Sequence, residues 1–266
     1  GEKYDIFQGA FAVIPKAYVI SPVKTIEYIS ESYDDAKRDL LDKKLAEVKA
    51  KTWDKGIEIP IFFTGSGNGW LESCNCYRHP YGGFTKLAAY FKNERKKNAA
   101  AIFADSGDFL PPGVSTAAAG YIFKALSLAG YDVIGTGDQD IFYGGLTEAV
   151  NKYQLPLLSS NMEICRSGSC VPAGAADKTF ERSGLKIRFL SFIPPDSFFL
   201  YPDDFLASLR LKKLEDLLKE GKKADFLVLL SHAGADYDKK IAVEIPGIDL
   251  IIGGHSKTLI TKPVKI

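Results

Sequence analysis

The sequence predicts an α/β fold built around a largely parallel, buried sheet. Short apolar runs of strand length alternate with segments of helical periodicity from residue 57 onward, and this alternation implies crossover connections between parallel strands. Several of the apolar runs end in polar or glycine-rich turns, and ligands gather at such turns along the carboxyl edge of an open α/β sheet. The sequence therefore also predicts a functional site at that edge.

Strands are expected where a short apolar run is bounded by turn residues. These runs cover residues 57–64, 99–104, 131–136, 155–159, 178–182, 185–193, 226–230 and 249–252. The runs 178–182 and 185–193 are separated by Ser183-Gly184 and predict a hairpin.

Helices are expected where apolar residues recur every three or four positions. In segment 84–97 the recurring residues are Phe84, Leu87, Ala88 and Phe91. Further helices are predicted at 115–128, 146–153 and 203–220.

The first 56 residues have a different pattern. Segment 34–53 places Leu41, Leu45 and Val48 on one helical face with charges on the others, and Gly56 is a suitable stop. No repeat, low-complexity tract or linker divides the rest of the chain. We expect an N-terminal helical extension, residues 1–56, packed on one main domain, residues 57–266.

The composition is that of a soluble globular protein. The 266 residues are 46% hydrophobic and 25% charged, which excludes a disordered chain, a collagen-like repeat and a coiled coil. Lysine and arginine number 34 against 33 acidic residues, a net charge of +1, and a nucleic-acid binder would need a basic surplus. No apolar run reaches the roughly 18 residues of a membrane span. We expect no nucleic-acid partner and no membrane span.

Polar turns follow five of the predicted strands, and small residues in them allow a ligand to approach the backbone closely. Two of the three histidines lie in these turns. The turns are Thr64-Gly65-Ser66-Gly67-Asn68-Gly69, Asp105-Ser106-Gly107-Asp108, Gly135-Thr136-Gly137-Asp138-Gln139-Asp140, Ser231-His232-Ala233-Gly234 and Gly253-Gly254-His255-Ser256-Lys257. We expect them to converge on one site.

The order of these turns resembles that of the calcineurin-like metallophosphoesterases, in the 5′-nucleotidase and UDP-sugar hydrolase branch. There the turns read approximately HTNDLHG, GD, GNHE, SH and GGHSH, and they bind two divalent metals. The likeness covers residues 57–266 and implies a sandwich of mixed sheets flanked by helices.

Several family residues are replaced in this chain. The Asp and His of the family's first motif, which bind one of the two metals, are Ser66 and Asn68, and the last His of the fifth motif is Lys257. The third motif's Asn is Asp138 and its His is Gln139. By this resemblance the first metal position has lost most of its ligands.

The second metal position keeps a complete set of donors. The resemblance assigns it Asp108, Asp138, His232 and His255, and two histidines with two carboxylates suit zinc, manganese or iron. We expect one divalent metal there, with Asn68, Gln139 and Lys257 orienting the substrate. The alternative is a dead site in which Asp138 and Lys257 pair as ions.

The cysteines fall in two close pairs. Cys74 and Cys76 lie between the first motif and the first helix, near the mouth of the expected site. A bacterial group similar to UDP-sugar hydrolase carries a Cys-x-Cys in this loop, which suggests a thiol or redox role, with a disulfide as the alternative. Cys165 and Cys170 can close a small loop as a disulfide or remain free thiols, and pairing between the two clusters is also open.

Three functions follow from these readings. The first is a metal-dependent hydrolase of a phosphate ester or related oxyanion with a degenerate, mononuclear site. The second is a catalytically inactive subunit that keeps the fold to bind a protein partner, and the third is a thiol or redox protein that uses Cys74 and Cys76.

The family resemblance and the start at Gly1, with Met162 as the single methionine, lead us to expect a periplasmic or secreted protein.

Overall fold

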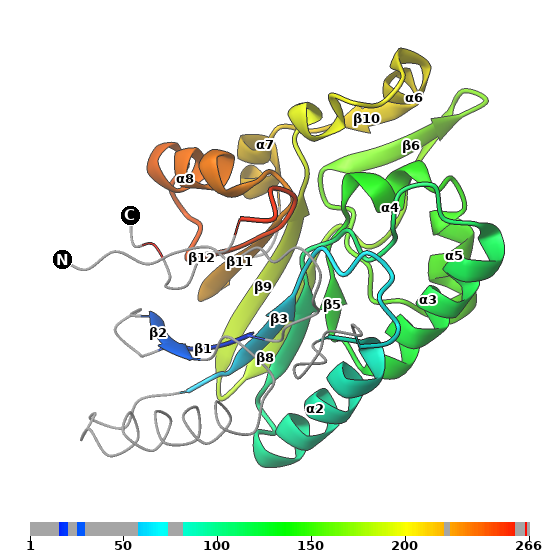
Figure 1. Cartoon of the computed structure of the whole chain (residues 1–266). Helices are drawn as coiled ribbons and strands as arrows, with labels where there is room; N and C mark the ends of the chain where they lie inside the picture. The colour runs from blue at the N-terminus through cyan, green and yellow to red at the C-terminus, as the bar shows by residue number, and fades with distance from the viewer. Residues whose placement is uncertain are drawn as a thin grey trace.

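The protein is a sandwich of two β-sheets with helices on both outer faces (Figure 1). The computed structural model describes residues 16–20 and 26–29, as backbone, and residues 58–73, 82–220, 224–258 and 264.

The first sheet has the order β2-β1-β3-β4-β5. Its strands are β1 Lys16–Ile20, β2 Ile26–Ile29, β3 Ile61–Thr64, β4 Ile102–Asp105 and β5 Val133–Ile134. β3, β4 and β5 run parallel, whereas β1 is antiparallel to both β2 and β3.

The second sheet has the order β12-β11-β9-β8. Its strands are β8 Lys178–Arg182, β9 Leu185–Phe192, β11 Phe226–Ser231 and β12 Leu250–Gly253. β9, β11 and β12 are parallel, and β8 returns antiparallel to β9 through the hairpin that the sequence predicts. Both sheets therefore have a parallel centre, and the antiparallel strands lie at an edge.

The core between the two sheets consists of side chains that alternate along each strand, since successive residues of a strand point to opposite faces. On β3, Ile61 and Phe63 pack between the sheets, while Phe62 packs on the outer side with the helices. The outer face of the first sheet is covered by α2 Phe84–Lys97, α3 Thr116–Ala129 and α5 Leu146–Tyr153. The outer face of the second sheet is covered by α7 Leu214–Lys219 and α8 Ala235–Glu244.

A smaller antiparallel sheet, β10-β6-β7, lies beyond the sandwich at the top of Figure 1. Its strands are β6 Met162–Arg166, β7 Ser169–Pro172 and β10 Leu209–Leu211. The neighbouring elements are the short helix α4 Asp138–Phe142, the 3₁₀ turn η1 Pro195–Phe198 and α6 Asp203–Ala207. Among the described residues, no helix combines the length and apolarity that a membrane crossing requires.

The predicted α/β sandwich is confirmed, and α2 and α5 have the predicted bounds. The single helix predicted for residues 203–220 is wrong: this segment forms α6, then β10, then α7. Residues 209–211 are extended because they pair with β6, so a tertiary contact overrides the leucine spacing. The strand predicted at 155–159 is reduced to isolated bridges at Leu157 and Leu158.

Other elements carry too weak a local signal to be predicted. α8 is rich in charged residues and has few apolar residues at helical spacing. The strands β1, β2, β6 and β7 are short. The strands β1 and β2 lie within the N-terminal segment and extend the first sheet. The helix predicted at 34–53 lies outside the described residues, so the division at residue 56 stays a prediction.

Candidate metal centre

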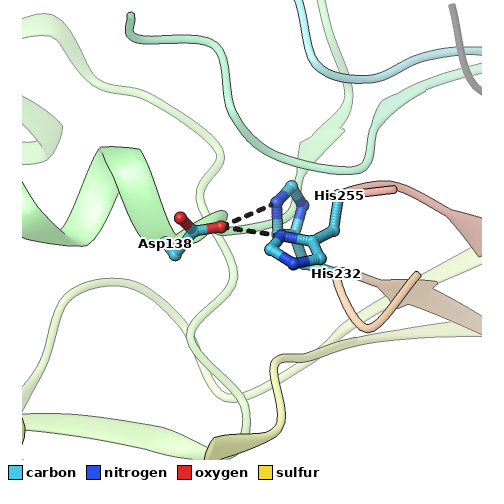
Figure 2. A group of neighbouring side chains, drawn as sticks. All are labelled: Asp138, His232 and His255. Atoms are coloured by element: carbon cyan, nitrogen blue, oxygen red, sulfur yellow. Dashed lines mark hydrogen bonds and ion pairs between the residues drawn. The ribbon is translucent and has the colours of Figure 1, made fainter. Parts of the chain in front are cut away.

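Four turns bring Asp108, Asp138, His232 and His255 together at the carboxyl ends of β4, β5, β11 and β12. The parallel centres of both sheets point their carboxyl ends toward the same region, which is why residues far apart in the sequence meet there. Figure 2 shows Asp138 facing His232 and His255. One donor atom from each of these three side chains lies within 4.8 Å of the others, a spacing that could hold a metal ion.

His232 is the most enclosed member of the group. Its side chain is fully buried, and its Nε2 atom lies 3.2 Å from Asp108 Oδ2 and 3.2 Å from Asp138 Oδ1. The Nδ1 atom of His255, whose side chain is 25% exposed, lies 3.0 Å from the same Asp138 oxygen. Asp138 Oδ1 is therefore the point on which both imidazoles converge.

The ring of His232 is held from its other side. Nδ1 lies 2.9 Å from the carbonyl oxygen of Ser106 and donates to it, and Ser197 Oγ donates to the backbone oxygen of His232. This orientation turns Nε2 toward the two carboxylates, where it has no well-aligned hydrogen bond within the described residues. A buried nitrogen facing two carboxylates needs a proton or a cation between them, so these residues fit a divalent cation.

Electrostatics at the site follow from burial and the two carboxylates. Burial by itself would lower the pKa of His232, but the negative charges of Asp108 and Asp138 raise this pKa well above its usual value. Burial opposes ionisation of Asp138, yet the nearby imidazole nitrogens of His232 and His255, at 3.2 Å and 3.0 Å, bring the pKa of Asp138 below its usual range. The site therefore stabilises positive charge beside ionised carboxylates.

Gln139 lies directly against Asp108. Its Nε2 donates to Asp108 Oδ2 at 2.6 Å and its backbone N–H donates to Oδ1 at 3.2 Å. The Gln139 Oε1 atom is buried and has no hydrogen-bond partner in the described structure. Gln139 thus orients one carboxylate of the site and presents an unused acceptor.

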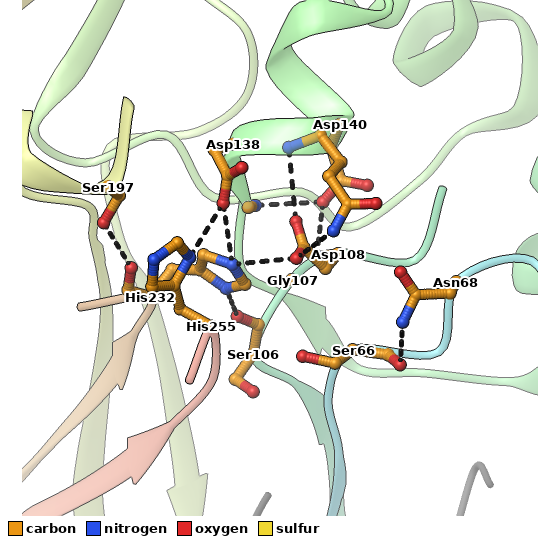
Figure 3. A network of polar contacts seen from close by, with 12 residues as sticks. Ser66, Asn68, Ser106, Gly107, Asp108, Asp138, Asp140, Ser197, His232 and His255 are labelled. Carbon is orange, nitrogen blue, oxygen red and sulfur yellow. Dashed lines mark hydrogen bonds and ion pairs between the residues drawn. The ribbon is translucent and has the colours of Figure 1, made fainter. Parts of the chain in front are cut away.

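The other predicted substrate-orienting residues are placed differently. Asn68 uses its side-chain amide to donate to the carbonyl oxygen of Ser66 at 2.6 Å, within its own turn (Figure 3). Lys257 is exposed. Among the described residues, the ion-pair partners of Asp138 are His232 and His255 and not Lys257, so the alternative Asp138–Lys257 pair is not formed.

The turns around the site have unusual backbone geometry. Ser66, Asn68, Asp108, His255 and Lys257 all have φ between 45° and 72°, a region that side-chain-bearing residues rarely adopt. Such conformations persist only where surrounding contacts hold them, and they concentrate at functional sites. The hydroxyl of Ser66 is also buried without a partner in the described structure.

Two positioning residues were missed by the sequence analysis. Asp140 accepts backbone hydrogen bonds from Asp108 at 2.8 Å, Leu110 at 2.9 Å and Gly137 at 2.9 Å, and so ties together the turns after β4 and β5. Its position in the first turn of α4 is a weak signal for this role. Tyr201 donates to Asp138 Oδ2, and nothing in the local sequence indicates that contact.

The predictions for the two cysteine pairs have different outcomes. Cys165 and Cys170 face each other across β6 and β7 and form a disulfide, which confirms one predicted alternative and rules out their free thiols and their pairing with the other cluster. Cys74 and Cys76 lie outside the described residues, and their role stays a prediction.

Comparison with curated sequences finds 5′-nucleotidases. "Protein 5NUC" of Lutzomyia longipalpis is 24% identical over 242 residues, covering 83% of this chain and 42% of that protein. A 5′-nucleotidase of Vibrio vulnificus is 27% identical over 157 residues, covering 51% and 28%, and that of Mus musculus is 26% identical over 200 residues, covering 67% and 33%. The chain spans less than half the length of these relatives, and no protein-family model matches it.

Comparison with solved structures gives the fold. The NAD nucleotidase of Haemophilus influenzae has a TM-score of 0.61 at 18% identity over 75% of this chain and 38% of that one. The calcineurin-like phosphoesterase YfkN of Bacillus subtilis has a TM-score of 0.57 at 16% identity over 73% and 71%. The sulfate thiohydrolase SoxB of Thermus thermophilus has a TM-score of 0.61 at 20% identity over 99% and 48%.

Proposed function

Because this chain has the calcineurin-like metallophosphoesterase fold and resembles the 5′-nucleotidase branch, we propose that it is a metal-dependent hydrolase of phosphate esters or related oxyanions with one divalent cation. The observation that carries the proposal is the buried Nε2 of His232, which faces carboxylate oxygens of Asp108 and Asp138 at 3.2 Å each. Such an arrangement is costly unless a positive charge lies among these atoms.

The proposed ligands are Asp108, Asp138, His232 and His255. This mixed nitrogen and oxygen set suits zinc, manganese or iron. A divalent ion held by these residues would lower the pKa of a water ligand and polarise a phosphoryl or related oxygen. The protein contributes a preformed geometry, since Asp140 fixes the turn of Asp108 and Ser106 fixes the ring of His232.

Substrate orientation is assigned to Asn68, Gln139 and Lys257. The buried acceptor Gln139 Oε1 can bind a substrate or water hydroxyl, and the exposed ammonium of Lys257 attracts an anion. Asn68 would first have to leave the carbonyl of Ser66. Gln139 cannot exchange a proton as a histidine can, so we expect slower turnover than from a two-metal phosphoesterase.

We also propose that the protein is periplasmic or secreted. The Cys165–Cys170 disulfide supports this location, because disulfides persist in oxidising compartments.

Elemental analysis of the native, unchelated protein tests the proposed function. About one divalent ion per chain is expected, lost in His255→Ala and retained in Ser256→Ala, a neighbouring change on the same turn. The native protein should then hydrolyse members of a panel of aryl phosphates, nucleoside monophosphates and sulfate esters, and His255→Ala should not.

The possible failures have separate meanings. No bound metal after incubation with zinc, manganese or iron would overturn the proposal in favour of an inactive binding or assembly subunit. Two ions per chain would contradict the mononuclear site.

A further inference from the structure

The carboxylate of Asp138 divides its two oxygens between different partners. Oδ1 lies 3.2 Å from His232 Nε2 and 3.0 Å from His255 Nδ1. Oδ2 instead accepts a hydrogen bond from the hydroxyl of Tyr201 at 2.6 Å. This distance is typical of a charge-assisted O–H···O⁻ hydrogen bond, which is stronger than a neutral one.

Tyr201 can hold Asp138 because its own ring is fixed. The ring centroid lies 4.9 Å from that of Phe142, 5.8 Å from that of Phe198 and 5.5 Å from that of Phe205. Phe142 ends the same short helix that Asp138 begins. The ring therefore packs against the far end of α4 while its hydroxyl binds the near end.

Without this contact, the Asp138 side chain has little to select its orientation. The terminal torsion of an aspartate is broad, so the carboxylate plane could rotate and carry the oxygen that faces the histidines out of line with them. The other donors near this carboxylate, His232 and His255, both act on Oδ1. The hydroxyl of Tyr201 holds the second oxygen and thereby fixes the plane of the carboxylate.

We propose that Tyr201 is a positioning residue that presents Asp138 Oδ1 to the metal by holding Oδ2. This inference rests on the proposed metal site and assigns Tyr201 no contact with metal or substrate. Groups that orient a metal ligand in this way commonly change metal affinity by 10- to 100-fold.

The test compares Tyr201→Phe with the unchanged protein. The variant keeps the ring among Phe142, Phe198 and Phe205 and removes only the hydroxyl. Titration of metal-free protein with Zn²⁺ against a competing chelator should show binding weakened by about 10-fold or more. The visible spectrum of the Co²⁺-loaded variant should also differ, because that spectrum reports the ligand geometry.

Tyr153→Phe is the matched control. Tyr153 is also a half-buried tyrosine in an aromatic cluster, and its ring stacks on Phe123. This variant should bind Zn²⁺ as the unchanged protein does. Phe205→Leu, which keeps the hydroxyl but loosens the ring, should give a smaller loss than Tyr201→Phe.

Each outcome decides the inference. A folded Tyr201→Phe protein that binds Zn²⁺ within two-fold of the unchanged protein, with the same Co²⁺ spectrum, would overturn it. If the unchanged protein binds neither metal, the proposed function fails and this inference falls with it. If the unchanged protein and Tyr201→Phe both bind Zn²⁺ with the same affinity, the inference fails while the proposed function stands.

Discussion

His232 Nδ1 lies 2.9 Å from the carbonyl oxygen of Ser106, and this hydrogen bond joins the end of β11 in the second sheet to the turn after β4 in the first. It aligns the two halves of the site, because it directs Nε2 of the same ring toward Asp108 and Asp138. Gly254 makes room for it: a Cβ atom at Gly254 would lie 2.7 Å from His232 Nδ1 and 3.0 Å from the Ser106 oxygen.

Gly254→Ala should therefore weaken both metal binding and stability. The added methyl group must displace the His232 ring or the turn of Ser106, and such overpacking costs about 1–3 kcal/mol. Urea unfolding and Zn²⁺ titration measure the two effects. Gly120→Ala is the control. Gly120 lies within helix α3, and a Cβ atom there would meet only Tyr153 Oη, at 3.4 Å. The stability of this variant should be unchanged or higher by up to about 1 kcal/mol, because alanine favours a helix more than glycine does. Equal behaviour of the two variants would contradict the close approach.

Gln139→Glu should destabilise the metal-free protein. The substitution preserves shape but replaces the donor that binds Asp108 Oδ2 at 2.6 Å with a carboxylate oxygen. Losing a hydrogen bond to a charged group costs about 1.5–3 kcal/mol, and like charges add to this. Saturating Mn²⁺ should recover most of the loss. Unfolding in chelator and in Mn²⁺ measures both effects, and Asn93→Asp, an exposed amide-to-carboxylate change within α2, is the control. No loss of stability in chelator would refute the prediction.

Asp238→Asn should change how stability depends on pH in the chelated protein. Burial raises the pKa of Asp238 from 3.8 to about 7, although the hydroxyl of Ser231 opposes this. The native state therefore keeps a proton that the unfolded chain releases, and stability falls as the pH rises from about 4 to 7. At 1.36 kcal/mol per pKa unit, the fall from this group is at most about 4 kcal/mol.

Asparagine does not titrate, so the variant should lack that part of the fall. Urea unfolding at pH 4.5 and at pH 7.5 measures the difference between the two proteins. Asp236→Asn on the same helix is the control, because the Asp236 side chain is 95% exposed. Parallel pH profiles for the unchanged protein and Asp238→Asn would contradict the raised pKa.

Removing the disulfide with Cys165→Ser and Cys170→Ser should lower stability without emptying the metal site. The bond closes a short loop and so restricts the unfolded chain. Removing it lets the unfolded chain regain conformational entropy, which lowers the free energy of unfolding by about 2 kcal/mol. The hairpin β6–β7 belongs to the small sheet, whereas the proposed ligands follow strands of the two large sheets. Elemental analysis should show unchanged metal content, and loss of metal in this variant would link the small sheet to the site.

Local patterns in the sequence determined the parts of the structure that depend on neighbouring residues. The bounds of α2 and α5 follow from apolar spacing along one helix. The turns with Asp108, Asp138, His232 and His255 follow strands whose apolar runs are continuous, and the order of those turns indicated the fold. The rule that the carboxyl ends of parallel strands lie along one edge of a sheet groups the turns of Asp108 and Asp138 in the first sheet and those of His232 and His255 in the second.

Only the tertiary structure decided the contacts between distant segments. β10 is a strand because it lies beside β6, and Tyr201 reaches Asp138 because the aromatic cluster packs against α4. The hydrogen bond from His232 to Ser106 likewise exists because two sheets stack with their carboxyl ends aligned. Periodicity records which face of an element is buried, but it does not record which partner covers that face, because many apolar surfaces satisfy the same pattern.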